Sequence, residues 1–285
     1  MTIDNSWTRK AKDTSAGFVG GAVQVLVGQP FDLVKVRLQT GQFSSPIEAV
    51  TQTIKHEGLL AFYKGTTAPL IGVGACVSVQ FYAFHETRRR ILQANNTAQL
   101  TYPQFYLAGA SAGLANTVIS APVEQLRILL QTQKTKIYNG PIDAIRKIVK
   151  VNGFQGLFRG FGITAVREAQ AYGVWFLTYE YLISQAVKKV AREEIPTWQL
   201  MAFGGLAGEA LWLASYPLDV LKSQVQSDKF GPDRKYHGAW DAAKKTYAAK
   251  GIAGFWKGIG PTLLRAVPAS ASTFASVELT LRLLG

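Results

Sequence analysis

A pattern of proline, an acid two residues later and a base three residues after that occurs three times in this sequence. The copies are Pro30–Lys35, Pro122–Arg127 and Pro217–Lys222, and they begin 92 and then 95 residues apart. Self-similarity at a fixed period indicates a chain built from repeated supersecondary units. The 285 residues are therefore expected to hold three related units rather than unrelated domains.

Further positions keep the same register around each proline. Glycines stand 13 and 9 residues before it, a glutamine stands 9 residues after it, and two more glycines, seven positions apart, follow downstream with an aromatic and a basic residue directly before the second. The glutamines are Gln39, Gln131 and Gln226, and the downstream glycine pairs are Gly58 and Gly65, Gly153 and Gly160, and Gly251 and Gly258. We therefore divide the chain into a tail, 1–12, and three repeats, 13–97, 98–193 and 194–285.

Charged residues are scarce and unevenly placed. They make up 17% of the chain, against roughly 25% in soluble proteins. None occurs in Thr14–Phe31, Thr66–His85 or Ile91–Val123, and about 18 such residues suffice to cross a hydrocarbon core of about 30 Å as helix. Polar residues such as Gln24 and Asn116 interrupt these stretches, which predicts helices with lipid on one side and an aqueous cavity on the other.

Each repeat is expected to form a long helix, a short amphipathic helix and a second long helix. The fold class predicted is an all-α membrane protein with six transmembrane helices. We place these near 13–39, 66–91, 104–131, 161–187, 198–226 and 259–283, with short helices near 45–57, 140–151 and 238–250. The repeated proline lies inside the first helix of each unit and should kink or end its straight run.

Composition excludes several other classes. The formal net charge of +13 suits nucleic acid or an anionic membrane surface, but the uncharged stretches argue against a soluble nucleic-acid-binding repeat protein. The single cysteine, Cys76, allows no intramolecular disulfide. Residues 1–13 lack the apolar core of a secretory signal. No Ser-His-Asp order, metal-ligand cluster or phosphate loop is present, so we expect no enzyme, no metal and no cofactor.

These repeated blocks resemble the mitochondrial carrier family, whose pattern is P-x-[DE]-x-x-[KR] followed by a glycine and an aromatic-[KR]-G. The resemblance covers all three repeats. It implies a bundle with pseudo-three-fold symmetry around one central site in the mitochondrial inner membrane, with the short helices in the matrix and both termini toward the intermembrane space. We expect a monomer that moves a small solute and binds no nucleic acid.

The repeated charges are expected to form a gate on the matrix side. Ionisable groups at membrane depth are costly and usually pair or face water, so six alternating charges can close a ring, with three glutamines one turn beyond to brace it. The alternative is a permanent structural network. The residues are Asp32, Lys35, Glu124, Arg127, Asp219 and Lys222, with Gln39, Gln131 and Gln226.

The resemblance implies a second gate on the even-numbered spans, with the pattern aromatic-[DE]-x-x-[KR]. Only Glu86 with Arg89 completes the acid–base pair, and it follows a histidine. Glu180 and Glu278 have no base three positions later. We therefore expect a weak cytoplasmic gate.

The charges that break the symmetry point to the substrate. Arg167 and Arg265 stand seven residues after Gly160 and Gly258, and the equivalent first-repeat residue is Gly72. The resemblance places substrate contacts at this level. An arginine can bind a carboxylate bidentately, Glu168 can accept an ammonium, and Gly72 leaves room for the rest of the solute.

Three more residues are candidates for the same site. The Trp212 ring can hold an ammonium by cation–π attraction, or serve packing alone. Glu209 is a second cation partner or a polar packing residue, and Gln80 is expected to line the cavity. The alternative for Arg167 and Glu168 is mutual neutralisation, which we disfavour because adjacent residues do not easily meet on one helical face.

This set resembles the carnitine/acylcarnitine and ornithine/basic-amino-acid branch, and Pro69–Phe81 looks most like fungal members related to carnitine carriers. Ornithine carriers typically have a glutamate where this chain has Cys76. We expect an alternating-access exchanger for a zwitterionic amino-acid-like or carnitine-type solute. The alternatives are an ornithine or basic-amino-acid carrier and a proton-leak protein of the same fold.

Helix N-termini with free amides bind phosphates well, and the resemblance makes such ends cardiolipin sites. The glycines expected there are Gly65, Gly140, Gly160, Gly238 and Gly258. The second and third repeats have Tyr138 and Tyr236 two residues before the short helix, whereas the first has Phe43-Ser44-Ser45 instead, so its lipid site is expected to differ.

Overall fold

A computed structural model of the chain describes the backbone of residues 5–97, 99–133, 135, 137–188, 190–231 and 233–283. Throughout these ranges the regular structure is helical. The long helices are α1 (Asn5–Gln39), α3 (Thr67–Asn95), α4 (Tyr102–Thr132), α6 (Phe161–Val187), α7 (Thr197–Ser227) and α9 (Ile259–Leu283), and the short ones are α2 (Pro46–Glu57), α5 (Pro141–Asn152) and α8 (Ala239–Lys250). Four 3₁₀ turns complete the chain: η1 (Leu59–Tyr63), η2 (Phe154–Phe158), η3 (Arg192–Glu194) and η4 (Ile252–Trp256).

The predicted all-α class is confirmed, and the expected helices lie close to the observed ones. The first long helix begins earlier than the expected residue 13, because α1 starts at Asn5. The repeated prolines do not end their helices: α1, α4 and α7 each continue past Pro30, Pro122 and Pro217. A membrane helix tolerates proline where neighbouring groups satisfy the freed backbone carbonyl.

The repeated glycines shape the link from each short helix to the next long one. Gly58, Gly153 and Gly251 end the short helices with φ of 79°, 66° and 59°. Gly65, Gly160 and Gly258, which precede α3, α6 and α9, have φ of 79°, 74° and 88°. Residues with a side chain rarely adopt positive φ. The two glycines thus allow the chain to change direction before and after the 3₁₀ turn that lies between them.

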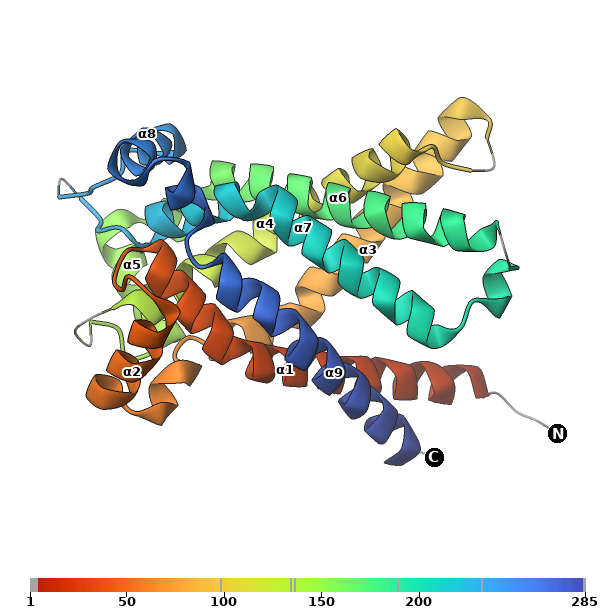
Figure 1. Cartoon of the computed structure of the whole chain (residues 1–285), viewed down its shortest axis with the longest axis horizontal. Coiled ribbons are helices and arrows are strands. Elements are labelled where there is room, and N and C mark those ends of the chain that lie inside the picture. The colour runs from red at the N-terminus through yellow and green to blue at the C-terminus, as the bar shows by residue number, and fades with distance from the viewer. Residues whose placement is uncertain are drawn as a thin grey trace.

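The three short helices gather at one end of the bundle, and α1 begins and α9 ends at the other (Figure 1). Each short helix packs on the second half of its own repeat's first helix, where Ala49, Ala144 and Ala242 are fully buried. These alanines stand nine residues before equivalent glycines. A small residue at this position lets the two helices approach closely, in all three repeats.

The long helices surround a central space but are not packed evenly. α9 lies along α1, α3 along α4, α4 along α6 and α6 along α7, whereas α1–α3 and α7–α9 meet over short stretches only. Even the shortest, α9, has 25 residues and at 1.5 Å per residue exceeds the hydrocarbon core. By length and mean hydropathy alone, two segments, Ser15–Gln39 and Leu59–Asn95, are apolar enough to cross a membrane.

Candidate functional site

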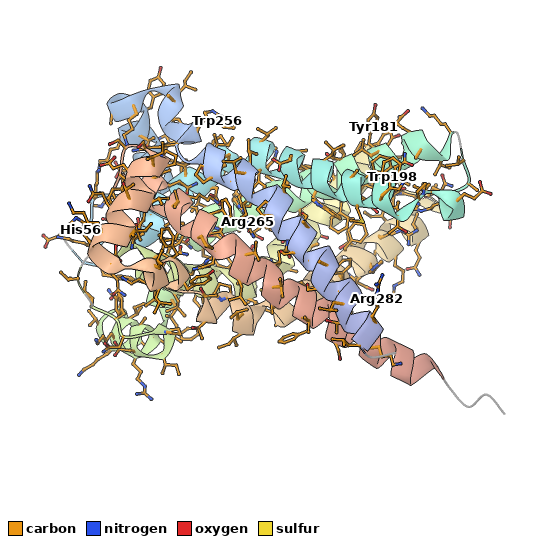
Figure 2. The ribbon with its side chains drawn as sticks, turned by 60° about the horizontal axis from the view of Figure 1, so that its bottom comes forward. His56, Tyr181, Trp198, Trp256, Arg265 and Arg282 are labelled. Atoms are coloured by element: carbon orange, nitrogen blue, oxygen red, sulfur yellow. The ribbon has the colours of Figure 1, made fainter. Side chains whose placement is uncertain are left out.

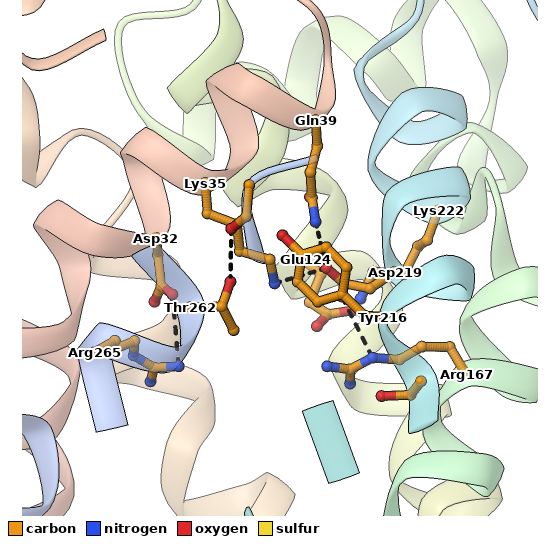
Figure 3. Close-up of polar contacts among 12 residues, drawn as sticks. Asp32, Lys35, Gln39, Glu124, Arg167, Tyr216, Asp219, Lys222, Thr262 and Arg265 are labelled. Carbon is orange, nitrogen blue, oxygen red and sulfur yellow. Dashed lines mark hydrogen bonds and ion pairs between the residues drawn. The ribbon is translucent and has the colours of Figure 1, made fainter. Parts of the chain in front are cut away.

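The repeated charges lie together at the end of the bundle nearer the short helices, where they form a closed ring. Arg127 of α4 pairs with Asp32 of α1 at 2.7 Å, Lys222 of α7 with Glu124 of α4 at 2.6 Å, and Lys35 of α1 with Asp219 of α7 at 2.6 Å. Figure 3 labels these residues apart from Arg127. Each pair joins two repeats, and together the pairs join all three. A small cavity of about 80 Å³ is left among them.

A much larger cavity opens on the other side of the ring. It measures about 560 Å³ and is lined by α1, α6, α7 and α9, from Thr197 at the start of α7 to Arg265. Arg265 lies on α9, about midway along the bundle. His56 marks one end of the bundle, and Tyr181 and Trp198 mark the other (Figure 2). Trp212 and Arg265 line both cavities, so they form the boundary between the open space and the ring.

The two unrepeated arginines reach the acids of the ring in an equivalent way. Arg265 lies 3.5 Å from Asp32, and the Arg167 Nε lies 3.4 Å from Asp219. Arg167 of the second repeat thus reaches the acid of the third, and Arg265 of the third repeat reaches the acid of the first. Each of these acids also has a shorter bond to one of the repeated bases. The Nε atoms of both arginines are buried and have no hydrogen-bond partner in the part of the chain that the structure describes.

The equivalent position in the first repeat is Gly72, and the room predicted there is not present. Gly72 is buried against α4, where an added Cβ would lie 3.2 Å from the Val123 side chain. By analogy with Arg167 and Arg265, a base at position 72 would reach Glu124, the acid of the second repeat. Because this position is a glycine, Glu124 lacks that second base. Glu124 has one ion-pair partner among the described residues, and its side chain is 28% exposed, against 11% for Asp32 and 4% for Asp219.

Arg167 and Glu168 do meet, although they are adjacent on α6. The Arg167 Nη1 bonds the Glu168 carboxylate directly, because long side chains can bend toward each other even from neighbouring positions. Glu168 also accepts a hydrogen bond from Asn116 of α4 at 3.3 Å. The expectation that the two side chains do not easily meet was therefore wrong, and Glu168 already has Arg167 and Asn116 as partners.

Trp212 faces cations of the protein itself. The Lys35 Nζ lies 4.2 Å from the centroid of its ring, and the Arg167 Cζ lies 5.1 Å from it. These distances are within the range of cation–π attraction. The indole thus holds one base of the ring and one unrepeated arginine on the floor of the larger cavity.

Glu209 and Gln80 lie in different surroundings. Glu209 lines the wall of the larger cavity, and none of the described residues forms a hydrogen bond or ion pair with it. Gln80 is buried, and it does not line either of the two cavities. Trp175 and Tyr179 stack with centroids 5.2 Å apart and line the larger cavity together with Glu209.

The three repeated glutamines do not act alike. The Gln39 side chain donates to Asp219 at 2.9 Å and so braces the ring. Gln226 instead donates to Thr164 at 3.3 Å, and both polar atoms of the Gln131 side chain are buried without a partner in the described structure. Bracing by all three was therefore wrong for this state, because Gln226 is bonded to Thr164 and the Gln131 side chain forms no described hydrogen bond to an acid.

The expected cytoplasmic gate is local. Glu86 pairs with Arg89 at 2.8 Å and with Arg90 at 2.7 Å, both on its own helix α3. Neither contact joins two helices. The structure is therefore closed at the ring and open at the opposite end. The side chain of Glu278 lies outside the described residues.

Four of the five glycines expected at lipid sites line two further cavities between repeats. One, of about 400 Å³, joins Gly65 before α3 to Gly140 before α5, and the other, of about 540 Å³, joins Gly160 before α6 to Gly238 before α8. Gly258 differs. Beside it the Lys257 Nζ donates to the Phe43 carbonyl at 2.8 Å, which ties α9 to the segment before α2.

Several residues contribute that sequence reasoning did not select. Gln29 donates to the Lys64 carbonyl at 2.7 Å and accepts from Arg127 at 2.5 Å, and Tyr216 donates to the Lys257 carbonyl at 3.1 Å. Both residues directly precede the repeated proline, so the repeat register could have found them. Gly28 was also missed: the Arg265 Nε lies 2.5 Å from where its Cβ would be.

The chain matches the family profile described as mitochondrial carrier protein over residues 6–95, 98–190 and 193–285. It is 45% identical over 285 residues to the glutamate/glycine mitochondrial carrier ymc1 of Schizosaccharomyces pombe, covering 96% of this chain and 95% of the relative. It is 44% identical over 288 residues to the mitochondrial glycine transporter YMC1 of Saccharomyces cerevisiae, covering 97% and 92%. Identity to the carrier protein YMC2 of the same yeast is 41% over 302 residues, covering 98% and 91%.

These relatives correct the expected branch. Two of the three names mention glycine and one also glutamate, but none mentions carnitine. The Pro69–Phe81 block and Trp212 were therefore poor guides to the branch, since they report helix packing and the floor of the cavity. The repeats, the ring and the whole-length match together show that the chain belongs to the mitochondrial carrier family, whose members are transporters and not enzymes.

Proposed function

We propose that this chain is an alternating-access exchanger of small zwitterionic amino acids. The observation that carries the proposal is the pair of guanidinium groups, Arg167 and Arg265, which line the cavity of the ring, with Arg265 lining the larger cavity as well. Each touches an acid that already has a shorter bond to another base. Arg265 can therefore turn toward a substrate carboxylate while Asp32 keeps its bond to Arg127, whereas Arg167 also holds the buried Glu168 and would leave it to Asn116.

The other end of a zwitterion needs an anion. Glu209 lies on the wall of the same cavity and has no described partner, so it can accept the ammonium of the substrate. The volume of about 560 Å³ falls within the usual range for small-molecule sites. Glycine and glutamate, which the names of the relatives mention, are the first solutes to test.

The ring supplies the barrier for such a cycle. In this state the solute reaches Arg265 from the end where α1 begins, and the ring blocks the way toward the short helices. Transport requires that the three pairs separate while the opposite end closes around the solute. In the inner mitochondrial membrane this cycle has the short helices in the matrix and both termini toward the intermembrane space.

The cavities at Gly65–Gly140 and Gly160–Gly238 suit lipid phosphates of cardiolipin type, since each combines helix N-termini with nearby bases. The third position, where Lys257 holds the Phe43 carbonyl, offers less space. We expect the protein to work as a monomer, because the cavity and the ring are complete within one chain.

The test is exchange in liposomes. Purified protein should take up labelled glycine against internal glycine or glutamate. Arg265→Ala and Arg167→Ala should each reduce the rate at least tenfold, because a charge-assisted hydrogen bond contributes about 1.5–3 kcal/mol. Arg88→Ala, which removes an exposed arginine of α3 outside both cavities, should leave the rate unchanged.

Other results would overturn the proposal. Exchange of carnitine or ornithine without amino-acid exchange would show another substrate class, and proton conduction without exchange would show a leak. If Arg265→Ala misfolds, Arg265→Lys keeps the charge but loses the bidentate geometry. It should then raise the KM for glycine, and an unchanged KM would contradict the assignment.

A further inference from the structure

Glu209 is the acid of the larger cavity that the described structure leaves without a partner. It lies on α7, half-buried in the wall, and water reaches it through the open end of the cavity. The acids of the ring and Glu168 each have a base within ion-pair distance. A carboxylate that is accessible, unpaired and next to a transport path can take up and release a proton.

The charges around the two cavities sum to zero only when Glu209 is ionised. The bases are Lys35, Arg127, Arg167, Lys222 and Arg265, and the acids other than Glu209 are Asp32, Glu124, Glu168 and Asp219. Five bases against four acids leave one positive charge. When Glu209 is ionised, its negative charge cancels this positive charge. When Glu209 is protonated, the net positive charge remains.

The net charge of the occupied cavity differs between two classes of amino acid. A neutral zwitterion adds no net charge, so it suits the site with Glu209 ionised. An acidic amino acid such as glutamate adds one negative charge, so it suits the site with Glu209 protonated. A net charge that has to pass through a low-dielectric barrier is costly, and a proton on Glu209 removes that charge.

We propose that Glu209 takes a proton from the water of the open cavity when an acidic amino acid binds, so that the two cross together, whereas a neutral amino acid crosses with Glu209 ionised. This inference rests on the proposed amino-acid transport. The proton joins a Glu209 carboxylate oxygen and leaves it on the opposite side. No covalent bond to the solute forms or breaks.

The groups that face Glu209 leave it free to do this. Around the cavity, α6 contributes Tyr179 as its titratable residue, α9 contributes Arg265, and α1 contributes the uncharged Gln24. Arg265 is engaged with Asp32. When the substrate carboxylate draws Arg265 away from Asp32, the field at Glu209 changes, which couples solute binding to the proton.

The experiment uses the full chain in liposomes that contain a pH-sensitive dye. With wild-type protein, glutamate added outside should acidify the interior in exchange for internal glycine, and an inward proton gradient should speed glutamate uptake several-fold. Glycine–glycine exchange should move no protons. Glu209→Gln should abolish the acidification and should make glutamate uptake respond to an imposed membrane potential instead. Glu48→Gln, which removes a carboxylate of α2 that lines neither cavity, is the matched control and should behave as wild type.

The outcomes separate the two proposals. If neither glycine nor glutamate exchanges, the proposed function fails. If both exchange but glutamate brings in no proton, or if glycine exchanges and glutamate does not, this inference fails and the proposed function stands. Continued acidification by Glu209→Gln also overturns it. If that variant misfolds, Glu209→Asp should retain coupled proton uptake, and its loss there would count against the assignment.

Discussion

At the scale of single residues, the position of Arg265 depends on a glycine one helix away. The guanidinium lies directly over Gly28 of α1, with its Nε 2.5 Å from where a Cβ would stand. The equivalent residues of the other repeats are Ser120 and Ser215. The first repeat therefore carries the smallest residue at the place where the arginine of the third repeat crosses it.

We predict that Gly28→Ala reduces glycine exchange about tenfold, comparable to the loss of one charge-assisted hydrogen bond. The new methyl group displaces the far end of a flexible side chain, so thermal stability should change little. Gly74→Ala is the matched control, since a Cβ there meets nothing within 4 Å. The prediction fails if exchange by Gly28→Ala equals that of wild type.

Sequence reasoning found the charged residues of the site but not how they are used. Their register was readable, because a repeated acid and base must meet their counterparts in a closed bundle. Gly72 was misread, since a missing side chain suggested space while Val123 of a neighbouring helix fills it. The bond between Arg167 and Glu168 was also misjudged. Such errors concern packing between helices, which spacing along one helix cannot report.

At the scale of elements, the first repeat holds its short helix through a charged side chain, whereas in the third repeat Thr246 of α8 donates a neutral hydrogen bond to Gln224 of α7 at 2.8 Å. Arg37 of α1 is 2% exposed and donates to Glu57 of α2 at 2.6 and 2.9 Å and to Thr53 at 2.8 Å. Its Nε donates to the Gln131 carbonyl of α4 at 3.2 Å. The equivalent position of the second repeat is Leu129, which packs against Ile148. The first short helix is therefore held by charge and the second by apolar contact.

We predict that Glu57→Gln lowers the thermal unfolding midpoint in detergent by roughly 2–4 °C, a modest value because the carboxylate is partly solvated. Burial raises the pKa of Glu57, but hydrogen bonds from Arg37 and Lys64 outweigh it and hold that pKa below its ordinary value. This contribution is therefore present above the unfolded pKa of about 4.3 and is lost as the pH falls through the folded pKa.

The difference between wild type and Glu57→Gln should accordingly be full at pH 7 and shrink below about pH 4. Differential scanning fluorimetry across this range measures it. Lys55→Gln, on the exposed side of α2, should not shift the midpoint. A constant difference at all pH values would show that shape rather than charge holds the helix.

The helices themselves were the most predictable part of the molecule. Their ends follow glycines, prolines and charges whose effect is local, and this is why α6 and α9 begin where the register indicated. The start of α1 was missed because its first turns are polar and carry no breaker. The unequal contacts between long helices depend on side chains from three repeats together and were not visible in any one of them.

At the scale of the whole molecule, the ring is uneven. Asp32 and Asp219 each have two ion-pair partners, whereas Glu124 has Lys222 alone in the described structure. We predict that the double variant Glu124→Gln, Lys222→Gln loosens the closed state. A cysteine in place of Ser223, which is 2% exposed and lines the cavity of the ring, reports this loosening in a Cys76→Ser background.

The double variant should raise the rate of maleimide labelling at position 223 about tenfold, since a loss of about 1.4 kcal/mol changes a population by that factor. The same cysteine with Arg88→Gln should be labelled as slowly as with the intact ring. Equal labelling in all three proteins would indicate that the pairs are a permanent structural network and not a gate.

The ring also has a consequence for how the protein is made. Asp32 can pair once Arg127 of the second repeat has been synthesised, but Lys35 must wait for Asp219, which lies 184 residues later. Until the third repeat joins the bundle, Lys35 lacks the Asp219 carboxylate that it pairs with in the complete protein. A chain that stops before the third repeat therefore lacks Asp219 and cannot form the Lys35 pair that closes the ring.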